Sequence, residues 1–246
     1  MAQFYDDFSG ETLGTSPGSL LSEYTTPIIF SVVEGNLLGT STKKVLLDTS
    51  DPNVNFARQG ASYKKSDITS SGKTTVLLLC EYHEASFFGS IVCGGFATDR
   101  RGYAQIVRFN DNRIFRYDGT GGNTTLARGG GPSSSLSDIN DIFTLWLEII
   151  KDGSVIETRW WDFNSGTRPS VAQLSVTDST PLAEGWVGVS VLTGNNTDKM
   201  WLHSIRVGTD GDPAPTSPVA TGPVTPINPS ITNLLATSAR LNWEQG

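Results

Sequence analysis

The sequence has few of the residues that mark several common classes of protein. No run of lysine or arginine exceeds two residues, and the formal net charge is −7. The concentrated basic stripe of a nucleic-acid-binding protein is therefore missing. No apolar stretch approaches the roughly 18 residues that a membrane-spanning helix requires. Two cysteines are too few for a disulfide scaffold. We expect neither a nucleic-acid partner nor a membrane span.

The N-terminus lacks the features of a secretory signal peptide. Its first ten residues hold neither a basic segment nor an apolar one. We therefore expect a protein made in a cytoplasm. Phage structural proteins are also made there and reach the outside when the host lyses.

Glycine, proline and short apolar segments are abundant instead. The chain has 26 Gly and 12 Pro, and blocks of Ala, Leu, Glu and Lys are almost absent. This composition is typical of strands joined by turns. Period-two alternation predicts strands at residues 4–8, 28–34, 36–38, 44–48, 55–57, 74–82, 90–98, 103–109, 113–118, 142–151, 154–163, 185–192 and 200–207. About ten to thirteen short strands without a convincing helix indicate a sandwich or a barrel.

Polar dipeptides and single glycines predict where the strands turn. Tight turns are expected at Gly35, Asp111-Asn112 and Asp152-Gly153. Residues 119–140 are predicted to form a long loop. Alternation places Phe143, Leu145, Leu147 and Ile149 on one face of their strand, and Trp201, His203, Ile205 and Val207 on one face of the last strand. Two packed antiparallel sheets follow from this pattern.

The four strands between residues 74 and 118 read as successive antiparallel neighbours. If residues 74–83 and 90–98 form a hairpin, Cys80 and Cys93 lie nearly opposite each other across it. A cross-strand disulfide is one interpretation. Two reduced core cysteines are the other, and the usual burial of free cysteine favours it.

Several short motifs resemble those of concanavalin-A-like and laminin-G-like domains. They are the opening Phe4-Tyr5-Asp6-Asp7-Phe8-Ser9-Gly10, the mid-domain Gly102-Tyr103-Ala104-Gln105, Trp146-Leu147-Glu148-Ile149 through Gly153, Gly185-Trp186-Val187-Gly188-Val189, and the closing residues 201–207. Their order and spacing match over nearly all of residues 1–208. The resemblance implies a two-sheet antiparallel jelly roll and identifies a fold, not an activity.

The composition changes after Gly208. Residues 209–228 are rich in proline and threonine, as in an extended, semi-rigid linker. Residues 229–246 are similar to the first two strands of a fibronectin type III domain, including its core tryptophan at Trp243. Two strands cannot bury a sandwich core alone. We expect the native chain to continue, with a partner that supplies the missing strands as the alternative.

Glycoside hydrolysis needs two carboxylates on one face, about 5 to 9.5 Å apart. The Glu-x-Asp-x-Glu pattern of glycanases with this fold is absent. The nearest pair is Glu148 and Glu157, on neighbouring strands, and Arg159 as an ion-pair partner explains both equally well. We expect no enzyme.

Asp51, Asn53 and Asn55 offer oxygen ligands at alternate positions, which suits calcium. The later glutamate and the glycine of an EF-hand loop are absent. Turns rich in Asp and Asn are common in β proteins. We expect no cofactor, with calcium at this turn as the alternative.

Sugar binding needs an aromatic platform beside hydrogen-bonding side chains. The adjacent pair Trp160-Trp161 puts one ring on each face of a strand. Trp161 shares its side with Glu157 and Arg159. Further candidates on strands expected to be neighbours are Tyr103, Arg108 and Tyr117. The alternative is that these rings simply fill the sandwich core.

Three hypotheses for function follow. The first is a non-enzymatic phage virion protein: a tail, fibre or capsid-decorating subunit that self-associates, docks on other virion proteins and adheres to host-surface glycans. It rests on the N-terminus and on the linker into a fibronectin-like segment. The second is a secreted bacterial carbohydrate-binding module or lectin. The third is a glycan-active enzyme.

Overall fold

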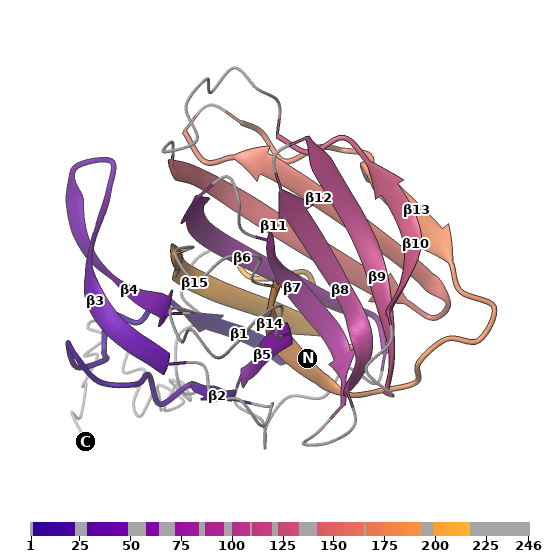
Figure 1. The fold of residues 1–246 in the computed structure, drawn as a ribbon, viewed down its shortest axis with the longest axis horizontal. Helices are drawn as coiled ribbons and strands as arrows, with labels where there is room; N and C mark the ends of the chain where they lie inside the picture. The colour runs from indigo at the N-terminus through magenta and orange to yellow at the C-terminus, as the bar shows by residue number, and fades with distance from the viewer. Residues whose placement is uncertain are drawn as a thin grey trace, which may run out of the picture.

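The computed structural model describes residues 2–22, 29–48, 58–63, 72–83, 87–95, 100–108, 110–119, 123–132, 142–164, 166–192 and 199–216. These residues form fifteen strands and no helix, arranged as two facing antiparallel sheets (Figure 1). The predicted all-β jelly-roll sandwich is confirmed. Among the described residues no helix could span a membrane.

One sheet has eight strands and contains both the first and the last strand of the sandwich. Its order is β13 (Leu174–Thr177), β12 (Val155–Asp162), β11 (Ile142–Asp152), β6 (Thr74–His83), β15 (Lys199–Thr209), β4 (Thr40–Asp48) and β3 (Ile29–Leu37), with β1 (Ala2–Asp6) paired to β15. The β3–β4 hairpin extends beyond the body of the sandwich (Figure 1).

The other sheet has seven strands. Its order is β10 (Asn123–Gly129), β9 (Asp111–Gly119), β8 (Arg100–Arg108), β7 (Phe87–Gly94), β14 (Trp186–Leu192), β5 (Arg58–Tyr63) and β2 (Leu20–Ser22). Runs of consecutive strands such as β7 to β10 stay within one sheet, whereas steps such as β6 to β7 and β14 to β15 cross between the sheets.

The main core lies between the sheets because alternate residues of each strand point inward. Leu145, Leu147 and Ile149 of β11 are buried in it, as the alternation predicts. Strand β8 contributes Tyr103 and Val107. A second buried cluster lies on the opposite face of the seven-stranded sheet, and it contains Ile91, Ala104, Ile106, Phe115, Tyr117 and Trp186.

The turns are placed partly as predicted. The Asp152-Gly153 hairpin is confirmed: Asp152 pairs with Val155, and Gly153 has φ 58°. The other two turns lie elsewhere. Gly35 is inside β3, and the chain turns at Leu38 (φ 50°) and Gly39 (φ 81°), because a two-residue hairpin of this twist needs two left-handed positions.

The second turn lies just before the predicted Asp111-Asn112. Both of these residues belong to β9, and Asn110, with φ 54°, is the left-handed residue. The predicted loop at residues 119–140 contains β10, which pairs with β9.

The predicted hairpin between residues 74–83 and 90–98 is wrong. Strand β6 pairs with β11 and β15, while β7 belongs to the other sheet and pairs with β8 and β14. Cys80 and Cys93 therefore come from different sheets, and both are buried thiols that form no disulfide. Burial raises the pKa of the Cys80 thiol well above its usual value.

Strand β15 also departs from the expected alternation. The register with β6 shifts between Leu202 and Ser204, so a β-bulge reverses which side chains point inward. Ile205 and Val207 lie in the core as predicted, but Trp201 and His203 do not.

The described chain continues past β15 and packs against it. Ala214 is buried, and the Gln3 side-chain amide donates a hydrogen bond of 2.8 Å to the Pro213 carbonyl. The first residues of the predicted linker therefore lie on the sandwich. The rest of the linker and the fibronectin-like segment, including Trp243, fall outside the described residues.

Candidate functional site

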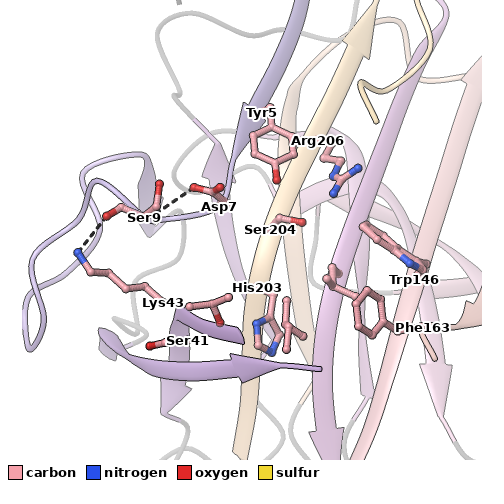
Figure 2. A pocket seen from close by; sticks show the side chains of 13 residues that line it. Tyr5, Asp7, Ser9, Ser41, Lys43, Trp146, Phe163, His203, Ser204 and Arg206 are labelled. Carbon is pink, nitrogen blue, oxygen red and sulfur yellow. Dashed lines mark hydrogen bonds between the residues drawn. The ribbon is translucent and has the colours of Figure 1, made fainter. Parts of the chain in front are cut away.

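Strand β15 shares one of its edges between two partners. Strand β4 pairs with it at residues 199–202, and β1 pairs with it at residues 205–209. The bulge at His203 and Ser204 lies where the two partners meet. A cavity of about 360 Å³ opens there on the outward face of the eight-stranded sheet. We call this cavity the trough (Figure 2).

The floor of the trough combines an apolar and two polar side chains. Leu79 of β6 and His203 and Ser204 of β15 line it, and all three are buried. Among the described residues, Ser204 Oγ and His203 Nδ1 have no hydrogen-bond partner. A buried hydroxyl or ring nitrogen normally has a partner. The floor therefore has unused hydrogen-bonding capacity.

One wall of the trough is aromatic. Trp146 of β11 stands directly opposite Trp161 of β12, and their ring centroids are 6.1 Å apart with an interplanar angle of 22°. The Phe163 amide donates to the Thr144 carbonyl and extends the ladder, so the Phe163 ring lies 6.1 Å from Trp146. All three rings are half-buried. Trp146 and Phe163 line the cavity, and Trp161 supports Trp146 from the far side.

Arg206 lies between two aromatic rings. Its guanidinium carbon is 4.5 Å from the centroid of Trp146 and 4.8 Å from that of Tyr5. Its Nη1 donates to the carbonyls of Thr216 at 2.8 Å and Pro215 at 3.3 Å. Burial lowers the pKa of Arg206 and raises the pKa of Tyr5. The rings fix the plane of the guanidinium by cation–π contact.

The opposite wall comes from the segment after β1 and from β4. Lys43 Nζ donates to the carbonyl oxygens of Ser9, at 3.0 Å, and Glu11. The Asp7 carboxylate accepts the Ser9 amide at 3.0 Å. Figure 2 shows Asp7, Ser9 and Lys43 on the side of the trough opposite Trp146 and Phe163, with the Lys43 amine directed toward Ser9.

The Glu81 carboxylate fixes the position of the His203 ring. His203 Nε2 is 2.7 Å from Glu81 Oε1, and Lys44 Nζ is 2.5 Å from Glu81 Oε2. Burial raises the pKa of Glu81, but the hydrogen bonds from His203 and Lys44 outweigh it, and the pKa lies below its usual value. Because Nε2 faces Glu81, the other ring nitrogen is left for the trough.

The structure brings Trp161, Arg159 and Glu157 to one face of β12, as the sequence indicates, but gives them different roles. Arg159 is buried and bonds Glu148 at 3.3 Å and Glu157 at 3.1 Å. Arg168 also bonds both carboxylate oxygens of Glu148, at 2.9 and 2.8 Å. Glu148 and Glu157 are thus held in ion pairs with arginine. Trp161 does not line the trough itself but stacks with Trp146, which does.

The other predicted sugar-binding residues are not brought together. Tyr103 lies in the main core, where its hydroxyl donates to Asp178 at 2.7 Å and accepts from the Leu182 amide at 2.9 Å. Tyr117 is in the second buried cluster on the other face of the sheet, and Arg108 is exposed. Successive side chains of a strand point to opposite faces, which separates Tyr103 from Tyr117 across paired strands.

The predicted calcium ligands Asp51, Asn53 and Asn55 fall outside the described residues. Within the part of the chain that the structure describes, no cluster of three or more His, Cys, Asp or Glu residues could hold a metal ion.

Sequence reasoning missed Trp146, Arg206 and the bulge. Trp146 could have been found, because counting back from the two-residue turn after Asp152 places it opposite Trp161. Arg206 could not, because the bulge that sets its face carries no local sequence signal.

Comparisons with known proteins bear on the fold. No family model matches the chain, and no curated protein matches it. Among solved structures, lectin I-B4 from Griffonia simplicifolia, in metal-free form, aligns with a TM-score of 0.50 and 11% identity, over 85% of this chain and 99% of that one. A lectin from Bauhinia forficata in complex with GalNAc aligns with a TM-score of 0.47 and 10% identity, over 84% and 97% of the two chains.

A carbohydrate binding module from Bacillus subtilis aligns with a TM-score of 0.45 and 10% identity, over 72% of this chain and 99% of that one. At such identities the likeness concerns architecture alone. The likeness to lectin I-B4, together with the two antiparallel sheets, identifies the fold of this chain as a concanavalin-A-like jelly roll.

Proposed function

We propose that the trough binds a saccharide and that the chain acts as a carbohydrate-binding module or lectin. The observation that carries the proposal is the half-buried aromatic wall of Trp146 and Phe163 beside the unpartnered Ser204 hydroxyl. A sugar ring has an apolar face that packs on aromatic rings and hydroxyls that need hydrogen-bonding partners. Ligand sites characteristically combine an apolar lining with a few such polar groups.

The fold is compatible with this function, since a lectin shares it. Fold alone does not assign an activity, so the trough carries the proposal. Binding without hydrolysis is part of it. Glu148 and Glu157 both bond Arg159, which supports a structural role for these carboxylates. We expect the parent protein and a Glu148→Gln variant to release reducing sugar equally, and both only at the level of a blank without protein.

Glycan-array binding with aromatic variants tests the proposal. Removing the Trp146 or the Trp161 ring should weaken binding about tenfold or more, because each ring supplies or supports the packing surface. Trp201→Ala is the matched control. This ring is half-buried over Lys44 and is not part of the trough lining, so binding should persist.

Melting temperatures of all three variants separate loss of binding from loss of folding. Absence of binding to every glycan, or equal binding by the Trp146→Ala and parent proteins, would contradict the proposal.

The virion hypothesis concerns where such binding is used, and it remains a prediction from the order of the sequence segments. An adhesive virion subunit and a secreted lectin would both use the trough. Immunogold labelling of purified virions with an antibody to this chain distinguishes them.

A further inference from the structure

Charges on the outward face of the eight-stranded sheet are distributed unevenly. Two buried carboxylates of this face have cationic partners: Glu81 bonds Lys44, and Glu148 bonds Arg168 and Arg159. The cations that line the trough differ. Among the described residues, Lys43 and Arg206 donate hydrogen bonds to backbone carbonyls, and neither forms a salt bridge with a carboxylate. Their charges are therefore available to a ligand.

The lining of the trough is locally positive on a chain of formal net charge −7. Lys43 and Arg206 are opposed by one lining carboxylate, Asp7, whose Oδ1 accepts the Ser9 amide. An uncancelled cation in a partly enclosed site attracts anions more strongly than one in open water, because solvent screens it less.

The geometry around Arg206 suits a carboxylate. A guanidinium has five donors, and the two carbonyls occupy Nη1 alone. Its Nε is buried without a hydrogen-bond partner among the described residues, and the Tyr5 side chain forms a further hydrogen bond with the group. The Tyr5 and Trp146 rings hold the plane of the group, so little side-chain freedom is lost when a planar anion binds.

We propose that the saccharide bound by the trough is acidic, with its carboxylate against Arg206 and within the field of Lys43. The sugar ring then packs on Phe163 beside Trp146, whose ring lies under the Arg206 guanidinium, and a ring hydroxyl bonds Ser204 Oγ. This inference rests on the proposed function and adds the chemical class of the ligand. Charge-assisted and bidentate contacts with arginine are the strongest polar contacts such a site offers.

A matched pair of ligands tests it directly. Oligomers of galacturonic, glucuronic and mannuronic acid are compared with their methyl esters, which keep the sugar and remove the charge. Calorimetry should give at least about tenfold tighter binding for the free acids at low salt. That preference should shrink as sodium chloride rises, because partly exposed charges are screened.

Two variants locate the preference. Arg206→Gln and Lys43→Gln should each bring the affinities for acid and ester closer together. Lys73→Gln removes the same charge from an exposed pair with Asp152, outside the trough lining, and should leave the preference intact. Parent-like melting curves for each variant show that the fold is kept.

The outcomes separate the two proposals. Equal or tighter binding of the esters, or of neutral glycans on an array, overturns the acidic preference and leaves saccharide binding standing. A preference for acids that survives in both Arg206→Gln and Lys43→Gln overturns the assigned site. Absence of binding to acids, esters and every arrayed glycan overturns both proposals.

Discussion

Glu81 is the residue that connects the trough floor to the edge strand β4. It accepts hydrogen bonds from Lys44 and His203 while almost buried. Such a carboxylate is stabilised in its charged form only while both partners remain, since an unpaired buried charge is costly. Its protonation should therefore weaken the folded protein and loosen His203.

The pH dependence of stability follows from this pairing. Burial raises the pKa of Glu81, but its two partners bring the net pKa below the ordinary value of 4.5. The folded state thus binds its proton less readily than the unfolded state. The contribution to the free energy of unfolding is complete above about pH 4.5 and is lost as the pH falls through the lower, folded pKa.

Urea denaturation over a range of about pH 3 to 7, which spans the ordinary pKa of 4.5, measures this effect. Glu81→Gln should be less stable at neutral pH, by about 1–3 kcal/mol, because the neutral amide offers one acceptor oxygen to two donors and no charge to Lys44. Its stability should fall less steeply in acid than that of the parent. Parallel curves for the two proteins would contradict this assignment. Asp111 and Asp178, whose pKa values are also lowered against burial, keep part of the acid sensitivity in both.

Strand packing at the second buried cluster depends on the absence of a side chain at Gly94. A Cβ atom there would lie 2.3 Å from Trp186 Cε2. The indole is fully buried and its Nε1 donates to the Gly95 carbonyl, so it cannot move aside without losing that bond.

Gly94→Ala should therefore destabilise the protein by about 1–3 kcal/mol or more, because it overpacks a filled space. Thermal melting monitored by tryptophan fluorescence measures the loss. Gly10→Ala is the control, since a Cβ atom at Gly10 would meet nothing within 4 Å. If Gly94→Ala melted at the same temperature as the parent, the close contact between Gly94 of β7 and Trp186 of β14 would be contradicted.

At the scale of strands, the sequence predicts what depends on neighbours along the chain. Asp152-Gly153 forces a two-residue turn, so the β11–β12 register and the outward position of Trp161 are predictable. The partner of β6 is not predictable in this way. Its alternation fits a hairpin with β7 as well as the true pairing with β11 and β15, and long-range packing decides between them.

The same limit explains what was missed in the trough. Alternation assigned His203 to the core side of its strand, and one extra residue in the β15 bulge turned it outward. Tyr103 shows the converse, since a candidate for binding became a core residue that joins the strand β8 to Asp178. Which aromatic side chains face solvent depends on pairings between distant strands.

At the scale of the whole molecule, composition and turn spacing predicted the sandwich but not which outer face carries a site. The seven-stranded sheet has a buried apolar cluster on its outward side. The eight-stranded sheet instead has the trough, assembled from β1, β3, β4, β6, β11 and β15. Most of these strands are distant from one another in sequence, so no single sequence motif could predict the site.

The pairing of β1 with β15 places Ala2 beside Thr209, so the start of the first strand and the end of the last strand of the sandwich lie next to each other. A circular permutant that joins Thr216 to Ala2 through a short glycine–serine segment, and opens between Gly153 and Ser154, should fold. The cut is at an exposed turn, and the β11–β12 ladder remains. Circular dichroism and thermal melting are used to compare the permutant with the parent. A control permutant cut between Leu78 and Leu79, in the core strand β6, should fail to fold. Because its two ends lie close together, the domain is also suited to insertion into a surface loop of another protein. The two sides of that loop would not have to move apart to accommodate it.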